Sequence, residues 1–340
     1  MPTTLKDVAL RAGVSIKTVS NVIHGNIHVK EEKRQRVLQA LKELNYQPNL
    51  PARYLRKGRV GILSLVIPEL RNPYFAEIAE AVIDAAAEQS YRVMLDFTSG
   101  TYEHERQAIE KLHSNLIDGI ILNSLMLKAE DLHIQGNEKL PIVLLGEHSL
   151  DMEYDHVTFD NVAAAYAATT HLLQLGRRQI AVIGFSRQMQ RETTLLRFRG
   201  YAQALADAGL SLQESLLVYT PTAYDRESGA QAVHTLLERQ QPFDALFCFN
   251  DLMAFGAMRA LYERGLHVPE DIAVVGFDDL EEARFSVPSL TTVAPDKRQI
   301  GTTAVTRLLQ CINGPETHVP GTVTVPFRLT MRESTGFTPQ

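Results

Sequence analysis

The sequence of 340 residues predicts an α/β protein with a small helical head and a core of two parallel-sheet lobes. Two observations lead to this fold class. Through the first 45 or so positions, apolar residues recur at the spacing of short helices. From Val60 onwards, apolar runs of about five to eight residues alternate with longer amphipathic segments. Such runs are typical of strands buried on both faces and joined by right-handed βαβ units.

Residues 5–26, LKDVALRAGVSIKTVSNVIHGN, predict two short helices joined by a tight turn. Thr4 and Asp7 have the spacing of a capping box at the start of the first helix. Gly13 supplies the left-handed residue that ends this helix, and Ser15 is suited to cap the second. The second helix then has an apolar face made of Val19, Val22 and Ile23. This is the helix-turn-helix arrangement, whose second helix enters the DNA major groove, although the turn alone equally fits any small helical hairpin.

A third helix is expected over residues 29–44, where an apolar stripe again has helical spacing. Gly25 and Asn26 mark the loop before it. The helix is expected to pack across the first two and to complete a headpiece over residues 1–47, on the scale of the smallest self-standing domains. Its stripe consists of Val37, Leu38, Leu41 and Leu44.

Residues 48–59 predict a hinge helix and linker after the headpiece. Pro48 bars a helix just before it, whereas Pro51 is tolerated in a first helical turn. A helix over residues 50–56 is too short to be stable alone in water, so it needs a partner. DNA is the partner indicated, because four basic side chains surround Leu55, namely Arg53, Arg56, Lys57 and Arg59. A plain interdomain linker is the alternative.

The charges are divided unevenly along the chain, whose net charge is −6. Residues 1–60 contain 12 Lys and Arg against 4 Asp and Glu, whereas the other 280 residues contain 22 against 36. A basic head of this kind is suited to phosphates, and an acidic body is suited to solvent. The charge distribution therefore supports DNA binding by the head.

The core, residues 60–340, is expected to alternate strands with helices. The strands in order are ILSLVIP, YRVMLDFT, DGIILNS, PIVLLGE, HVTFD, QIAVIGF, SLLVYT, DALFCFN and DIAVVGFDD. Helices are expected over residues 74–90, 103–115, 161–175, 194–208, 227–239 and 251–264. Residues 291–295, a helix over 296–311 and the run TVTVPFRLTMRES are expected to cross back between the lobes. The polar break at 148–155 indicates an N-lobe of about 60–157 and 290–318, and a C-lobe of about 158–289 and 319–340.

Ligands of open parallel sheets bind beyond the carboxyl ends of the strands. Aromatic residues at these ends are Tyr74, Phe75 and Tyr224, and hydrogen-bonding residues are Asn123, Arg191, Arg197, Asn250 and Asp278. This mixture is suited to a small polyhydroxylated or heterocyclic ligand. Asp251, which opens a helix, is open to a plainer interpretation as an N-cap.

The sequence lacks the signature motifs of several other classes of protein. The motifs GxGxxG after the first strand, GxxxxGK[ST], GxSxG and HExxH are absent from the sequence. The histidines do not pair with Cys or acidic residues at metal-ligand spacing, so we expect no metal, no cofactor and no enzyme. Cys248 and Cys311 form no disulfide framework, and Cys248 is expected to be a buried strand residue. Without an apolar leader or a membrane-spanning run, we expect a cytoplasmic, nucleoid-associated protein with no membrane partner.

Three stretches together resemble the lactose/galactose repressor (LacI/GalR) family: TLKDVALRAGVSIKTVSNVIHG, YQPNLPARYL and VIPELRNPYFAEIAEAV. The resemblance covers essentially the whole chain. The core motifs NPYFAEI, FCFNDLMAFGAM and VPEDIAVVGFDD are similar to those of the purine-repressor branch. The family implies a dimeric transcription regulator with a helix-turn-helix head, a hinge helix and a two-lobed core of the periplasmic-binding-protein type that binds an effector.

The resemblance also implies roles for residues of the head. Ile16, Lys17 and Asn21 match recognition-helix positions that face base edges, and Asn21 replaces an Arg of many members, which favours adenine. Leu55 matches the leucine that family dimers insert into the minor groove. The other DNA-binding candidates are Thr4, Ser15, Thr18, Ser20, Asn49, Ala52 and Arg53.

In the core, Arg197 of RFRGY matches the effector-binding arginine of the family. Other residues that match cleft positions of relatives are Tyr74, Phe75, Arg191, Thr193, Tyr224 and Asp278. Three residues depart from the family pattern. Lys30 replaces the serine that usually caps the third helix, so Glu31 and Glu32 must complement the dipole of that helix instead. Pro51 lies within the hinge helix, and Gly146 replaces an Asp of several sugar-binding members. No leucine-heptad tail follows residue 332, so a dimer rather than a tetramer is expected.

We therefore expect a sequence-specific repressor that binds a pseudo-palindromic double-stranded operator as a homodimer under the control of a small effector, with a sugar or sugar derivative favoured. A purine-responsive corepressor-type regulator, a sugar-binding receptor without DNA function and an α/β enzyme acting on a sugar are the alternatives.

Overall fold

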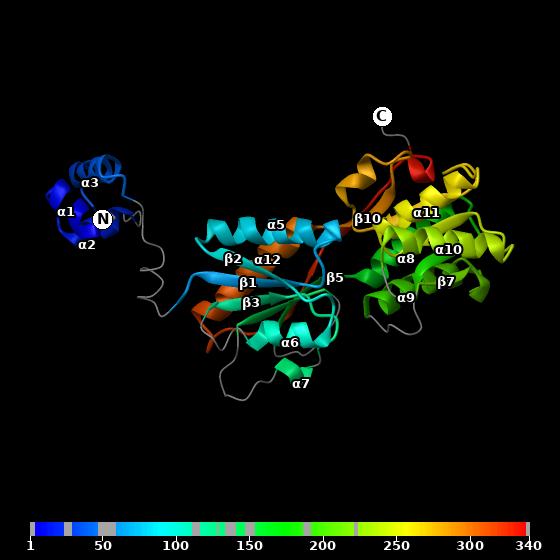
Figure 1. Ribbon diagram of the computed structural model, residues 1–340, viewed down its shortest axis with the longest axis horizontal. Coiled ribbons are helices and arrows are strands. Elements are labelled where there is room, and N and C mark those ends of the chain that lie inside the picture. Colours follow the sequence, from blue (N-terminus) through cyan, green and yellow to red (C-terminus); the bar gives the residue numbers. More distant parts are fainter. Residues whose placement is uncertain are drawn as a thin grey trace. The chain divides into compact units, whose positions relative to one another are not determined.

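The computed structural model describes the chain in segments: residues 4–23, 29–46, 59–110, 116–127, 129–132, 141–146, 154–185, 192–220 and 224–337. The chain divides into two compact units, residues 1–59 and residues 60–340, which are shown in Figure 1. Among the described residues, the first unit contains three short helices, and the second contains two six-stranded sheets with helices on their faces.

The head consists of α1 (Leu5–Ala12), α2 (Ile16–Ile23) and α3 (Glu31–Glu43). The capping box of Thr4 and Asp7 is present, and Gly13 ends α1 with a left-handed φ of 62°, as predicted. The buried centre contains Val8, Ala9, Ala12, Val19, Val22, Val37 and Ala40. One prediction for the stripe of α3 is wrong: Leu38 is 46% exposed, because the buried positions on this helix are those of Val37 and Ala40.

The first sheet of the core has the strand order β11-β5-β4-β3-β1-β2, with every pair parallel. Its strands are β1 (Ile62–Ile67), β2 (Arg92–Phe97), β3 (Gly119–Leu122), β4 (Ile142–Leu145), β5 (Asp155–Phe159) and β11 (Thr322–Val325). The helices α5 (Pro73–Glu88) and α12 (Lys297–Asn313) lie on one face, and α6 (Tyr102–Glu110) and α7 (Ala129–Leu132) lie on the other (Figure 1).

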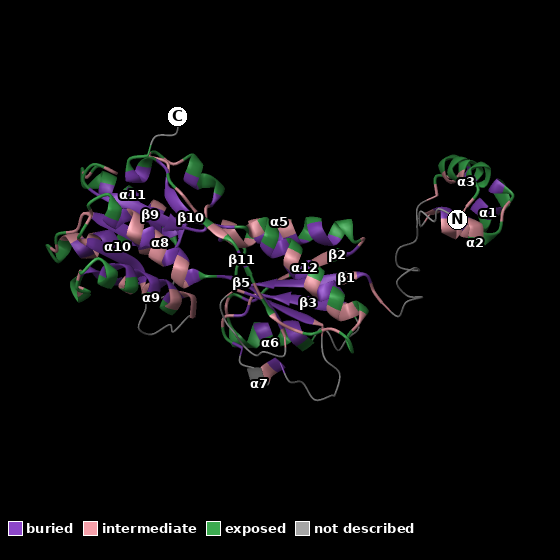
Figure 2. Ribbon diagram, turned by 180° about the vertical axis from the view of Figure 1, so that it is seen from behind, coloured by how far each residue is buried: buried purple, intermediate pink, exposed green. Residues whose placement is uncertain are grey.

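The second sheet has the order β12-β10-β9-β8-β6-β7, in which only β10 and β12 are antiparallel. Its strands are β6 (Ile180–Phe185), β7 (Leu217–Tyr219), β8 (Ala245–Cys248), β9 (Ala273–Phe277), β10 (Thr291–Pro295) and β12 (Phe327–Thr330). Its helices are α8 (Asn161–Gln174), α9 (Glu192–Asp207), α10 (Arg226–Glu238) and α11 (Asp251–Glu263), with 3₁₀ turns at Glu214–Leu216, Glu281–Arg284 and Glu333–Thr335. Figure 2 shows buried strands between helices whose outer faces are exposed. Cys248 is buried in β8, as expected, and burial raises the pKa of its thiol.

The chain passes between the two sheets at three points: after β5, after β10 and between β11 and β12. Asp160 and Asp296 cap α8 and α12 at the first two crossings, and Pro326 alone forms the third. Two expected lobe assignments are corrected: β10 belongs to the second sheet because it pairs with β9, and β11 belongs to the first because it pairs with β5. The first crossing also follows β5 rather than falling at residue 157 within it.

Helices α10 and α11 of the second lobe approach each other closely through two glycines. A Cβ atom on Gly256 of α11 would lie 1.7 Å from the carbonyl oxygen of Arg226. A Cβ atom on Gly229 of α10 would lie 2.0 Å from the carbonyl oxygen of Met253. Because the obstructing atoms are backbone, they cannot rotate away, and the separation of α10 and α11 depends on these two glycines.

We predict that Gly256→Ala destabilises the second lobe by about 3 kcal/mol or more, because the added methyl group must push two helix backbones apart. Thermal unfolding followed by circular dichroism measures the loss. Gly321→Ala is the control, since a Cβ atom there has only Arg307 as an ordinary neighbour at 3.9 Å. Equal melting temperatures for the two variants would contradict the prediction.

Candidate functional site

A cavity of about 810 Å³ lies in the core beyond the carboxyl ends of strands from both sheets. Strand order reverses between β1 and β3 in the first sheet and between β6 and β8 in the second. Such points are the usual ligand sites of open α/β sheets. Eight of the nine effector-binding candidates line this cavity: Tyr74, Phe75, Asn123, Thr193, Arg197, Tyr224, Asn250 and Asp278. The ninth, Arg191, lies outside the described residues.

The guanidinium of Arg197 lies at the floor of the cavity and is 8% exposed. Its Nε donates to Oδ1 of Asn161 at 2.8 Å, and another of its nitrogens donates to the carbonyl oxygen of Phe249. The group stacks on the ring of Phe277, with 3.6 Å between the guanidinium carbon and the ring centroid. Oδ1 of Asp278 lies 3.9 Å from the remaining nitrogen. Arg197 is therefore held in one orientation, with the edge beside Asp278 left for a ligand.

The turn after β9 carries Asp278 into the cavity with an unusual backbone. Asp278 and Asp279 both have positive φ, 108° and 49°, which is uncommon for residues other than glycine. Beneath the turn, the fully buried Asp251 accepts hydrogen bonds from the Leu280 amide at 2.8 Å and the Thr292 hydroxyl at 2.6 Å. Burial raises the pKa of the Asp251 carboxyl well above its ordinary value, and the nearby Asp278 carboxylate adds to the rise.

Asn250, not Asp251, caps α11, so the interpretation of Asp251 as an N-cap is wrong. Oδ1 of Asn250 accepts from the Met253 amide at 2.9 Å, and its Nδ2 donates to the carbonyl oxygen of Tyr224 at 2.8 Å. The Tyr224 hydroxyl in turn donates to the carbonyl oxygen of Gly184 at 3.0 Å. These bonds fix the position of the Tyr224 ring on the cavity wall.

The opposite wall comes from the first sheet. Asn72 caps α5 by accepting from the Tyr74 amide at 3.1 Å, which sets the helix turn on which Tyr74 and Phe75 lie. Their rings meet edge to face, 5.4 Å apart. After β4, Gly146 has a φ of 89°, and a Cβ atom on it would lie 3.3 Å from Nδ2 of Asn123. The Asp that the family resemblance implies for several sugar-binding members would therefore be strained at this position.

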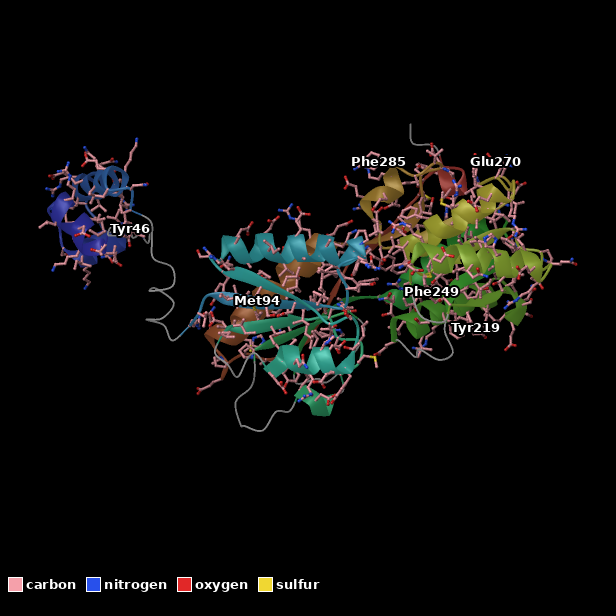
Figure 3. The ribbon with its side chains drawn as sticks, viewed as in Figure 1. Tyr46, Met94, Tyr219, Phe249, Glu270 and Phe285 are labelled. Atoms are coloured by element: carbon pink, nitrogen blue, oxygen red, sulfur yellow. The ribbon has the colours of Figure 1, made fainter. Side chains whose placement is uncertain are left out.

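Several lining residues were missed by sequence reasoning. They are Phe97, Leu125, Asp225, Arg226, Phe249 and Leu252. Phe97 ends β2 and Phe249 directly follows β8, so the apolar pattern assigned both to the sheet interior. Figure 3 labels Phe249 on the side of the second lobe nearest the first. The position of an aromatic residue at the end of a strand was the one signal that could have identified them.

The head presents one face of α2 outwards, because Val19 and Val22 turn the opposite face inwards. On the outer face Ile16 is 48% exposed, Lys17 is exposed, and Thr18, Ser20 and Asn21 are half-buried. The hinge candidates Asn49, Ala52, Arg53 and Leu55, with Pro51, lie outside the described residues.

Two other candidates of the head are engaged in capping. The Ser15 hydroxyl accepts from the Thr18 amide at 3.2 Å and lies 2.9 Å from the Thr18 hydroxyl. The Thr4 hydroxyl donates to Asp7 at 2.7 Å, and this bond, with that of the Thr4 amide, lowers the pKa of the Asp7 carboxyl. Lys30 makes no side-chain cap at α3, and Glu31 and Glu32 occupy its first turn, as expected.

Comparisons with known proteins match both units. Residues 4–49 match the model of bacterial regulatory proteins of the lacI family, and residues 169–335 match a periplasmic binding protein-like domain. The HTH-type transcriptional repressor PurR of Histophilus somni is 32% identical over 91% of this chain and 92% of its own length. The chain belongs to the lacI family of bacterial regulatory proteins.

Solved structures of lacI-family regulators share the fold. The lac repressor dimer bound to operator and the anti-inducer ONPF is 29% identical, with a TM-score of 0.78 over 98% of this chain and 99% of that one. The transcriptional regulator CelR in its cellobiose complex is 32% identical, with a TM-score of 0.71 over 98% and 99% of the two chains. The chain is thus a DNA-binding transcription regulator with an effector-binding core, and it is not an enzyme.

The described residues contain neither a candidate metal-binding cluster nor a membrane-spanning helix. Within these segments, no group of three or more His, Cys, Asp and Glu side chains could hold a metal ion. No helix among the same residues is both long and apolar enough to cross a membrane.

The placement of α2 generates a prediction about operator recognition. Asn21→Ala should weaken binding to a selected operator by about 1–3 kcal/mol and leave binding to random DNA unchanged, because the family resemblance implies a base-edge contact that Ala cannot make. Fluorescence anisotropy with the two duplexes measures both affinities. Gln35→Ala, at an exposed position of α3, is the control. An equal loss on both duplexes would make Asn21 a backbone contact instead.

Proposed function

We propose that this lacI-family regulator is a repressor that binds a pseudo-palindromic operator as a homodimer and responds to a neutral sugar in the core cavity. The cavity carries the proposal, because it collects aromatic and hydrogen-bonding side chains from the strand ends of both sheets. Its volume lies within the usual range for sites of small ligands.

A neutral ligand is favoured by the charges around the cavity. The described lining residues include three acidic side chains and three basic ones: Glu69, Asp225 and Asp278 against Arg71, Arg197 and Arg226. Arg197 already has Asp278 as a neighbour, so little excess positive charge remains for an anion. Paired carboxylate and guanidinium groups are suited to hydroxyl groups, which both donate and accept hydrogen bonds. CelR, which resembles this chain throughout, was solved with cellobiose.

A heterocyclic ligand such as a purine is the second candidate. Tyr74 and Phe75 present aromatic surface on one wall, and Phe97 and Tyr224 present more. Aromatic rings are suited to the faces of sugars and of bases alike, so the hydrogen-bonding groups decide between them.

For DNA we propose that Ile16, Lys17 and Asn21 read base edges, while Thr4, Ser15, Thr18 and Ser20 contact the backbone. In the hinge, Leu55 would enter the minor groove, with Asn49, Ala52 and Arg53 beside it. A regulator of this kind works in the cytoplasm, where operator DNA is found, and needs no membrane partner.

An apolar surface on the second lobe supports the homodimer. It is formed by α11 and the loop after the 3₁₀ turn at Glu281–Arg284, around a hollow of about 610 Å³. Tyr262, Phe285 and Val287 are 74%, 70% and 96% exposed there, and Figure 3 labels Phe285 on this loop. Monomeric proteins rarely expose such a patch, and the related lac repressor is a dimer in its operator complex. We assign a second copy of the chain as its occupant.

We predict that a neutral sugar changes operator affinity by about five- to 150-fold, the ordinary range for coupled sites. The measurement is anisotropy of an operator duplex, selected by the protein from a random pool, against neutral sugars, sugar acids and purines. Arg197→Lys should still bind the operator but lose the response, since Lys cannot reproduce a planar group held between Asn161 and Phe277.

Arg199→Lys, at an exposed position of the same helix, is the control for this change. A response confined to sugar acids or purines would refute the neutral-sugar assignment.

We also predict that Val287→Asp weakens the homodimer about tenfold or more, because it places a charge in an apolar interface. Sedimentation equilibrium measures the dimer dissociation constant. Val319→Asp is the matched control, a 77% exposed valine between α12 and β11. If both variants dimerise like the wild type, this surface is not the interface.

A further inference from the structure

The ammonium of Lys297 lies at the crossing after β10, where the chain returns from the second lobe to the first. Lys297 begins α12, directly after the cap Asp296 and the buried strand β10. α12 packs on α5 so closely that a Cβ atom on Gly301 would lie 2.8 Å from the carbonyl carbon of Ala81. The backbone of Lys297 therefore moves with α5 and the first lobe.

The side chain of Lys297 reaches across to the second lobe. Its Nζ donates to the carbonyl oxygens of Asp278 at 2.7 Å and Asp279 at 2.8 Å. It also forms an ion pair with the carboxylate of Glu77 on α5. An ammonium has three protons to donate, and these three oxygens account for all of them. The side chain of Lys297 is 14% exposed, so little water competes for these bonds.

The two groups joined by Lys297 carry opposite walls of the cavity. On the second lobe, the Asp278 side chain lines the cavity beside Arg197. On the first lobe, Glu77 lies one helical turn after Tyr74, which lines the facing wall. The carbonyls that Lys297 holds belong to the two residues with positive φ, whose backbone needs such support.

From this geometry we infer that Lys297 and Glu77 are positioning residues for the effector response. Through them, the turn that carries Asp278 is tied to the helix that carries Tyr74. A ligand that moves either wall changes the interactions of Lys297 with the Asp278 and Asp279 carbonyls and with Glu77. These interactions in turn set the separation of the two walls. The inference rests on the proposed function for its ligand, but the bond itself is testable without one.

Amide hydrogen exchange of the full-length protein tests the link. The amides of Asp278, Asp279 and Leu280 are hydrogen-bonded to Val293, Thr292 and Asp251, so they report on the turn. Glu77→Gln should speed their exchange about tenfold although the change lies in the other lobe, and Lys297→Met should speed it further. Glu80→Gln, exposed on the same helix, is the matched control, and unchanged exchange in β8 shows that each variant is folded. If Glu77→Gln exchanges like Glu80→Gln, the link between lobes is refuted.

Calorimetry with cellobiose as the probe tests the role in binding. Glu77→Gln and Lys297→Met should bind cellobiose about ten- to hundredfold more weakly than the wild type. Lys297→Met removes the charged donor of the two carbonyls, and Glu77→Gln removes the carboxylate that pairs with this donor. Equal affinity of wild type and variants would overturn the positioning role. If the wild type itself does not bind cellobiose but the exchange result is positive, the link between the lobes stands and cellobiose is excluded as the ligand of the cavity.

Discussion

The core depends on the topological constraint that parallel strands end at one edge of a sheet. Each sheet collects polar and aromatic side chains at that edge, and the chain passes between the sheets three times. The crossings are short: Asp160 and Asp296 each start a helix at once, and Pro326 alone separates β11 from β12. The two edges are thereby brought to one cavity, and residues as distant in sequence as Tyr74 and Asp278 line it together.

Much of the fold could be predicted because it is encoded locally. The Thr4–Asp7 box and Gly13 bound α1, and apolar runs mark the strands, since these signals depend on neighbours within a few residues. The membership of β10 and β11 could not be predicted, because an apolar run does not encode which strand lies beside it. The cavity was predictable through the rule of strand ends. That rule still missed Phe97 and Phe249, whose apolar character suits the sheet interior equally well.

The balance of charges differs between the two units of the molecule. In the head they are unbalanced, with 12 basic residues against 4 acidic ones over residues 1–60, as a surface for phosphates requires. At the core cavity, Arg197 and Asp278 form a buried pair of opposite charges, and the Arg197 guanidinium is oriented by hydrogen bonds. Arg197 is held by Asn161 and Phe249, and Lys297 is held by two carbonyls. Orientation of this kind lowers the entropy lost on binding, so modest contacts can give useful affinity.

Gly146 limits how the ligand preference of this chain can change during evolution. An Asp at this position would add a carboxylate to the cavity wall, but the backbone here is left-handed and Asn123 lies close to any added side chain. A single substitution of Gly146 by Asp would therefore give a protein with a strained loop after β4, and a second substitution would be needed to relieve the strain. The backbone conformation at Gly146 therefore restricts which ligands the cavity can come to bind. A laboratory selection for new ligands should begin by varying the loop after β4 together with Asn123.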